Sequence, residues 1–205
     1  MRAARSGGAL SRRRIVRGLA VRMLRAQAKS FEVGEEGGAG MASPNARYFT
    51  TGARRAERAA WGMMAAGAII TLAGVAVLPE EVPVHWGAGG QPDRYGSPAT
   101  YLLLPGILVF CNAIMSFVVH FLDPDTWSKP GDLREEDKQR WWQTSVSVVV
   151  GCEAALGGWL LLDSLLTVAQ LSDLMLPSIA LLVVVMAAAI AFPLVEWRRY
   201  IRDRS

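Results

Sequence analysis

Cysteine and histidine are scarce in this chain, with two residues of each among 205. Cys111 and Cys152 both fall within apolar runs, and no Cys-x-x-Cys pair or Cys/His cluster is present, so neither a zinc site nor a disulfide framework is indicated. We expect both cysteines to be buried free thiols. The glycine run at 87–90 is too short to cradle a phosphate and follows no predicted strand. No nucleophile–base arrangement is present either, and we therefore expect no enzyme, no cofactor and no metal.

Charged residues are missing from four long apolar segments. The chain is 52% hydrophobic, and its mean hydropathy is positive at +0.25. Such runs are typical of helices that cross a bilayer, because the hydrocarbon core needs about 20 consecutive apolar residues. We predict an all-α integral membrane protein whose domain, residues 51–205, is a bundle of four transmembrane helices. The predicted spans are 61–78, 101–122, 143–162 and 174–195.

The basic residues flank the predicted spans. All but one of the 22 Lys and Arg residues precede the first span, lie in the 123–142 loop or follow the last span, and only Arg94 lies in the loop 79–100. By the positive-inside rule, both termini are cytoplasmic and the loop 79–100 faces outward. The net charge of +4 therefore does not indicate nucleic acid. We expect a multi-pass protein of the bacterial cytoplasmic membrane, whose partners are the lipid bilayer, an extracytoplasmic peptide or protein ligand and a second copy of the chain.

Residues 1–50 form a basic tail that we treat separately from the membrane domain. Ile15 and Leu19 share one helical face opposite Arg22, a pattern typical of a helix on anionic lipid. A twin-arginine export signal is excluded because Arg17 and Arg22 interrupt the region that should be apolar. The alternative, which we favour, is a disordered tail or an extension upstream of a natural start at Met41.

Small residues and capping patterns add detail to the spans. Gly67 and Gly74 lie on one face of the first span, where they would let a neighbouring helix approach closely. After the second span, Asp132 and Glu135 have the spacing of a capping box, which predicts a short interfacial helix before the third span.

Two polar residues, Glu153 and Asn112, lie deep within predicted spans and at similar depth. An acid there is costly and is a functional candidate by default. One hypothesis makes Glu153 a proton- or cation-coupling site. The other, which we favour, is a neutral Glu153 hydrogen-bonded to Asn112, tying two helices together. Asp163 is expected to be solvated at the outer boundary, and His120 to be an interfacial anchor that could titrate near neutrality.

The loop 79–100 is rich in proline, glycine and aromatic residues. Proline restricts the backbone and glycine permits sharp turns, so the loop is expected to be stiff, and 92–96 has the signature of a turn with proline in its second position. His85 with Asp93 would sense pH or hold a cation; the favoured alternative is a self-packed lid in which both satisfy backbone groups. The candidate functional residues of the loop are Pro79, Pro83, His85, Trp86, Gly90, Pro92, Asp93 and Tyr95.

The run Leu78-Pro79-x-x-Val82-Pro83-x-His85-Trp86-x-x-x-Gly90-x-Pro92-Asp93-x-Tyr95-Gly96 resembles the signature of a bacterial membrane family known as a domain of unknown function. The same domain occurs in SdpI-like proteins, whose namesake gives immunity to a secreted toxin and transmits its presence to a cytoplasmic repressor. This sequence departs from the family pattern at Gly87, where a polar residue is usual, and it lacks the extra spans of full SdpI-like chains. The resemblance implies a non-enzymatic protein whose outward loop recognises a ligand or partner, with signalling or immunity as one form. The alternative, suggested by Glu153, is a small proton- or cation-coupled transporter or channel subunit.

Overall fold

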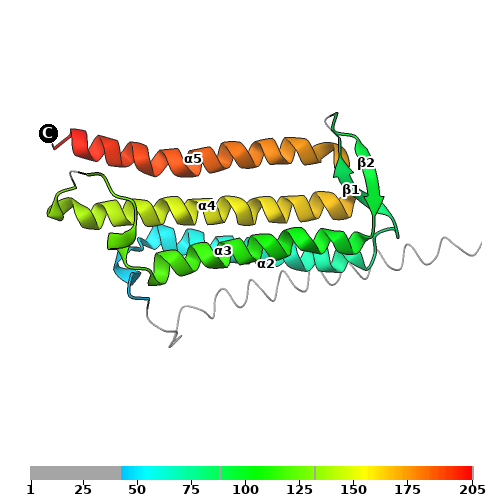
Figure 1. Ribbon diagram of the computed structural model, residues 1–205, viewed down its shortest axis with the longest axis horizontal. Coiled ribbons are helices and arrows are strands. Elements are labelled where there is room, and N and C mark those ends of the chain that lie inside the picture. Colours follow the sequence, from blue (N-terminus) through cyan, green and yellow to red (C-terminus); the bar gives the residue numbers. More distant parts are fainter. Residues whose placement is uncertain (1–42, 88, 132, 205) are drawn as a thin grey trace, which may run out of the picture.

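The computed structural model describes residues 43–87, 89–131 and 133–204. Four long helices lie side by side, and a two-stranded hairpin covers one end of them (Figure 1). The elements, with 3-10 helices written η, are η1 (Ala46–Tyr48), α2 (Thr51–Val75), β1 (Val82–Trp86), β2 (Pro92–Gly96), η2 (Pro98–Leu102), α3 (Leu103–Phe121), η3 (Pro124–Thr126), α4 (Glu135–Ala169), η4 (Ser172–Leu174) and α5 (Met175–Arg202).

The two ends of the bundle differ in character. The start of α2, the α3–α4 connection and the end of α5 lie together, and we call this the basic end (Figure 1). The hairpin and the α4–α5 connection lie at the opposite end, which we call the hairpin end. The prediction of a surface helix or disordered tail for residues 1–42 lies outside the described residues.

The four predicted membrane spans are confirmed. The helical segments Thr51–Val75, Pro98–Phe121, Glu135–Ala169 and Met175–Arg202 are each long and apolar enough to cross a bilayer. Large apolar side chains project outward from them; Phe110 on α3 and Phe192 on α5 are 66% and 67% exposed. An outer surface of this kind suits lipid better than water.

Several helix boundaries differ from the predicted ones. α2 begins at Thr51 rather than 61, because the Thr50 side chain accepts a hydrogen bond from the Ala53 N–H and caps the helix. No separate interfacial helix forms: α4 is one continuous helix from Glu135, and its acidic first turn complements the helix dipole. α5 continues past residue 195 to Arg202, so Pro193 lies inside it.

α4 is the central helix of the bundle. It contacts α2, α3 and α5, and its closest neighbour is α2 (Figure 1). A Cβ built at Gly157 would lie 2.6 Å from the carbonyl oxygen of Ala60, and one at Gly67 would lie 2.9 Å from Leu160 Cγ. A Cβ at Gly74 would likewise lie 2.5 Å from Val168 Cγ2, so the predicted close approach at Gly67 and Gly74 is confirmed.

Residues 43–50, placed in the tail by the sequence, pack against the basic end. The Asn45 side chain donates to the carbonyl oxygens of Val119 (3.2 Å) and Leu122 (2.7 Å), and the Ser43 hydroxyl donates to that of His120 (2.8 Å). These carbonyls lie at the end of α3, where no following helical turn supplies N–H groups to donate to them. The segment therefore acts as a cap for α3, and the membrane domain begins earlier than residue 51.

A cluster of charged and aromatic side chains at the basic end joins α5 to α4. Asp137 is 1% exposed and accepts a hydrogen bond from the Tyr200 hydroxyl at 2.8 Å. It also pairs with Arg204 and, at 3.4 Å, with Arg134. The Trp141 and Trp197 rings meet edge to face, 5.1 Å apart between centroids. Charge pairing and aromatic packing thus hold together two helices whose remaining surfaces are largely apolar.

The loop at the hairpin end contains secondary structure that the sequence did not predict. β1 and β2 pair antiparallel, with Val82 opposite Gly96 and Trp86 opposite Pro92. Residues 92–96 are therefore a strand rather than a turn, and the glycine run does follow a strand. The turn lies at 87–91, where the Gly87 N–H donates to the Gln91 carbonyl and Gly90 adopts φ +75°. The all-α prediction is confirmed for the membrane domain and is extended by this hairpin.

Candidate functional site

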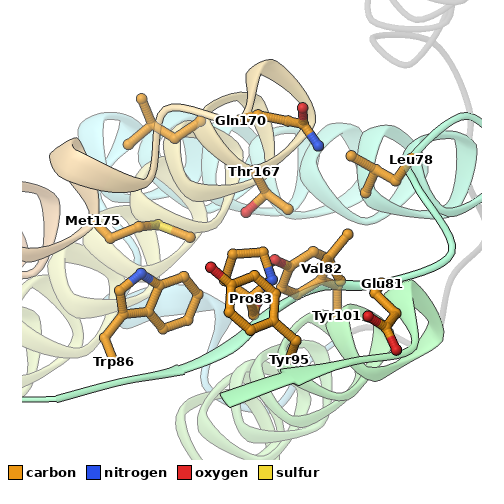
Figure 2. Close-up of a pocket in the computed structure, with 11 residues that line it drawn as sticks. Leu78, Glu81, Val82, Pro83, Trp86, Tyr95, Tyr101, Thr167, Gln170 and Met175 are labelled. Carbon is orange, nitrogen blue, oxygen red and sulfur yellow. Dashed lines mark hydrogen bonds between the residues drawn. The ribbon is translucent and has the colours of Figure 1, made fainter. Parts of the chain in front are cut away.

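A cavity of about 280 Å³ lies between the hairpin and the helix ends. This volume lies just below the range of roughly 300–1,000 Å³ typical of small-molecule sites, and it suits one large side chain or one small head group. Figure 2 shows Trp86, Pro83 and Tyr95 along one wall, with Thr167 and Gln170 across from them. The lining residues are Leu78, Glu81, Val82, Pro83, Trp86, Tyr95, Tyr101, Leu166, Thr167, Gln170 and Met175.

Local hydrogen bonds hold the walls of this hairpin cavity in place. The Tyr101 hydroxyl donates to the Pro83 carbonyl at 2.5 Å, which fixes β1 to η2. On the opposite wall α4 ends in a Schellman motif: Leu171 N–H donates to the Leu166 carbonyl and Gln170 N–H to that of Thr167. Gln170 takes the left-handed conformation that this motif requires, with φ 58°. The cavity is thus formed by fixed backbone on both sides.

Trp86 carries the most informative polar atom of the cavity. Its indole N–H is buried and has no acceptor among the described residues. Figure 2 places the indole nitrogen on the side of the ring that faces Met175. A buried donor without an acceptor costs about 1–3 kcal/mol, so its presence calls for a partner such as a ligand carbonyl or an ordered water.

The structure brings His85 and Asp93 together, as the sequence suggested. The distance from His85 Nδ1 to Asp93 Oδ1 is 2.5 Å, and the two side chains are 56% and 50% exposed. Neither residue lines the cavity. The pair joins β1 to β2 at the surface of the hairpin. Among the described residues, the His85 and Asp93 side chains bond to each other there, and not to backbone groups as the favoured alternative predicted.

The remaining loop candidates divide into cavity and turn residues. Pro83 and Tyr95 line the cavity, and Pro79 is exposed in the connection that leads into it. Gly90 adopts φ +75°, so its conformation favours glycine, and a Cβ there would lie 2.9 Å from the end of the Leu176 side chain. Pro92 pairs with Trp86 across the hairpin.

Asn112 and Glu153 are both 0% exposed inside the bundle. The predicted hydrogen bond between them is wrong: both polar atoms of the Asn112 amide and Glu153 Oε2 have no partner among the described residues. Glu153 Oε1 instead accepts from the Ser116 hydroxyl at 2.8 Å, and Ser116 Oγ accepts from the Trp61 indole N–H at 3.2 Å. Ser116 lies one helical turn from Asn112 on α3 and takes the predicted partner's place.

Sequence reasoning missed Ser116, Trp61 and Glu57. The Glu57 carboxylate pairs with His120, with 2.6 Å between Oε1 and Nε2. One signal could have found the set: Asn112, Ser116 and His120 are spaced by four residues and therefore share one face of α3. His120 is held between Glu57 and the stacked ring of Phe49, near the end of α3, and its role as an interfacial anchor stays a prediction.

Two further expectations are corrected. Asp163 is only 9% exposed, because α4 turns it toward neighbouring helices instead of toward solvent. Cys152 is buried as predicted, but Cys111 is exposed on the outer face of α3, where its thiol faces the surroundings of the bundle.

Comparison with known proteins matches a segment that includes the hairpin and the seven cavity-lining residues from Leu78 to Tyr101. Residues 62–109 match the model of a family described as a domain of unknown function (DUF1648). An uncharacterized protein of the archaeon Archaeoglobus fulgidus is 36% identical over 76 residues, which cover 31% of this chain and 42% of that protein. The chain thus spans less than half the length of this relative. No solved structure matches the chain significantly. The resemblance predicted from the sequence, to a domain whose function is unknown, is confirmed for the segment from α2 through the hairpin to α3.

Proposed function

We propose that this chain is a non-enzymatic receptor of the bacterial cytoplasmic membrane, whose hairpin cavity recognises an apolar side chain of an extracytoplasmic peptide or protein. The observation that carries the proposal is the unpaired Trp86 indole N–H at the wall of a cavity lined by both apolar and polar side chains. Signalling or immunity, as in SdpI-like proteins, is one form that such recognition takes.

The chemistry of the walls favours a peptide. Apolar and aromatic side chains from Val82, Pro83, Trp86 and Met175 would contact one apolar side chain. The indole N–H would donate to a carbonyl oxygen beside it, and a peptide carries such a carbonyl at every residue. The volume of about 280 Å³ suits that single anchor better than a whole drug-sized molecule.

The recognition proposal is tested with N-acetyl-leucinamide, which offers one apolar side chain and two carbonyls. We expect saturation-transfer NMR to detect its binding to the full chain in nanodiscs. Trp86→Phe keeps an aromatic ring, smaller than the indole, and removes the donor; it should weaken binding about 5- to 10-fold, since one hydrogen bond contributes about 1 kcal/mol. Trp159→Phe is the matched control, because its indole donates to Ser178 at 3.3 Å, away from the cavity. Equal binding by both variants contradicts the proposal.

The outward placement of the hairpin rests on the distribution of basic residues. A cysteine at Gln91 should react with a membrane-impermeant thiol reagent in intact cells, and a cysteine at Lys129 should react only after lysis. The unmodified chain, with Cys111 and Cys152, gives the background. The reverse pattern would overturn the orientation, and with it the extracytoplasmic ligand.

A second candidate function is a small proton- or cation-coupled transporter or channel subunit. It is favoured by Glu153, a fully buried acid with one carboxylate oxygen unpaired. Each variant is tested for its ability to rescue the phenotype of a strain from which the gene has been deleted. Glu153→Gln should fail to rescue if transport is the relevant function. Trp86→Phe should fail to rescue if recognition in the hairpin cavity is the relevant function. Association of two copies in the membrane stays a prediction.

A further inference from the structure

The inner half of the bundle, between Glu153 and the basic end, contains a row of polar side chains. On α3, Asn112, Ser116 and His120 follow one another at one-turn intervals and span about 12 Å along the helix axis. On α2, Glu57 and Trp61 are likewise one turn apart. The two helices therefore present matching polar positions to each other in a region where apolar side chains are otherwise the rule.

Hydrogen bonds link these side chains at two successive levels of the bundle. Nearest the basic end, His120 Nε2 and Glu57 Oε1 are 2.6 Å apart. One turn deeper, Trp61 donates to Ser116 at 3.2 Å, and Ser116 donates its only proton to Glu153 at 2.8 Å. We call the set Glu57, His120, Ser116 and Glu153 the polar row. It leads from the partly exposed His120, whose side chain is 24% exposed, to the fully buried Glu153.

At the deep end of the polar row, polar atoms of Glu153 and of the neighbouring Asn112 have no hydrogen-bond partners in the part of the protein that the structure describes. Glu153 Oε2 and both amide atoms of Asn112 are buried and have no partner among the described residues. Asn112 lies about 6 Å beyond Ser116 on the same face of α3. Three such atoms, each costing about 1–3 kcal/mol when unpaired, indicate that water or a bound proton belongs at this level.

Beyond Glu153 the path toward the hairpin is closed. Met64 and Leu160 are both 0% exposed, and the backbones of α2 and α4 meet at Gly157 and Gly67. We call these four residues the apolar seal. A polar contact between α2 and α4, from Thr71 to Ser164 at 2.8 Å, lies on its far side. Water continuous with the polar row would therefore stop at the seal.

We propose that the polar row is a proton-access path that connects the basic end with Glu153 and that the apolar seal closes it to the hairpin end. One proton enters at His120, passes through water to the Ser116–Glu153 pair, and protonates the carboxylate; release reverses the same steps, and no group of the row is consumed. The titratable groups that face Glu153 are Glu57 on α2, which interacts with it electrostatically, its chain neighbour Cys152 on α4, and His120 on α3, one turn from the bonded Ser116; residues 175–195 of α5 carry none.

A proton fits this site better than a metal cation. Hard cations are held by about six or more oxygen ligands, whereas the described side chains at this level that carry unpaired or shared oxygens are those of Glu153, Ser116 and Asn112. Chains of Asp, Glu and His inside membranes are typical of proton relays. The inference does not rest on the recognition function proposed above. Access of protons to Glu153 from the basic end does not require the chain to move net charge across the membrane.

The test uses the full chain in liposomes, sorted for one orientation through a cysteine at Gln91. Infrared difference spectra should show a protonated-carboxyl band that is lost in Glu153→Gln. Its amplitude should follow the pH on the basic side and ignore the pH on the hairpin side. His120→Gln should slow this response at least tenfold, and His85→Gln, which changes the other histidine, should leave it unchanged.

Serine variants keep the test decisive if His120→Gln fails to fold. Ser116→Ala should slow the response, Ser116→Thr should restore it, and Ser147→Ala, whose hydroxyl bonds only within α4, should have no effect. A band that ignores pH on both sides, or one that follows the hairpin side, overturns the proposal. A band that responds to sodium at constant pH replaces the proton by a cation and also overturns it. Proton access without net flux would refute the transport candidate and leave the path intact.

Discussion

The contact between Gly157 and Ala60 gives the sharpest prediction for the bundle. In Gly157→Ala the new Cβ would lie 2.6 Å from the Ala60 carbonyl oxygen and 3.3 Å from its Cα. These are backbone atoms of a neighbouring helix, so no side chain can rotate away to make room. Since carbon–oxygen contacts stay at about 3.3 Å or more, α2 and α4 must separate locally by about 0.7 Å.

The expected cost follows from two opposing effects. Overpacking a tight interface costs about 1–3 kcal/mol, and replacing glycine by alanine inside a helix returns about 1 kcal/mol. The matched control is Gly158→Ala, the next residue of α4, where the Cβ would meet only Met63 Sδ at 3.7 Å. The control should be unchanged or up to about 1 kcal/mol more stable, so the two variants should differ by about 1–3 kcal/mol.

The assay is reversible denaturation in detergent micelles, followed by circular dichroism and by near-ultraviolet absorption of the tryptophans. Gly157→Ala should unfold at lower denaturant concentration than the unmodified chain, and Gly158→Ala should not. Equal midpoints for the two variants would refute the close α2–α4 approach on which the apolar seal depends.

Three further predictions concern the ends of the bundle. Asp137→Asn should lower the midpoint of denaturation more than Glu135→Gln, because the Asp137 carboxylate is 2% exposed and the Glu135 side chain is 85% exposed. Asn45→Ala leaves two carbonyls of α3 without donors and should cost about 1–2 kcal/mol in the same assay. Gly90→Ala forces a side chain into the left-handed region at a cost of roughly 1–2 kcal/mol and should increase proteolysis of the hairpin, whereas Gly89→Ala, with open space around it, should not.

The membrane domain could be predicted because its signals are local. Each span is an uninterrupted apolar run, and the glycine pair at 67 and 74 repeats with the period of one helical face. The extension of α4 to Glu135 was harder to predict, because its first turns are charged and only the structure shows that they continue the same helix. The basic end and the hairpin end could be told apart because every Lys and Arg residue except Arg94 lies on one side of the predicted spans.

The hairpin could not be predicted because its sequence carries strand-breaking residues. Pro83 and Pro92 argue against strands in a sheet interior, but in a two-stranded ribbon every strand is an edge and the missing N–H can face outward. The turn signature at 92–96 competed with this possibility and was the stronger local pattern. Pairing across the glycine run is a longer-range effect that no residue of β2 reveals by itself.

The polar row was missed for a different reason. α3 is apolar on nearly all sides, so its hydrophobic pattern does not define which face meets the other helices. Glu153 was therefore paired with Asn112 by depth alone, and the rotation of α3 brought Ser116 to it instead. In lipid, where both faces of a helix are apolar, the hydrophobic pattern does not give the rotation about the axis, and the four-residue spacing of Asn112, Ser116 and His120 is the signal that could have given it.

The central position of α4 has a consequence for biogenesis. α2 and α3 leave the ribosome first, yet two of their polar side chains, Thr71 and Ser116, have hydrogen-bond partners on a helix that has not yet been made. Until α4 enters the bilayer, the contacts of Thr71 with Ser164 and of Ser116 with Glu153 cannot form, in a medium that offers no water in their place. Insertion of the third span is thus the step that commits the chain to its fold, and a truncation before Glu135 should leave two helices without a stable arrangement.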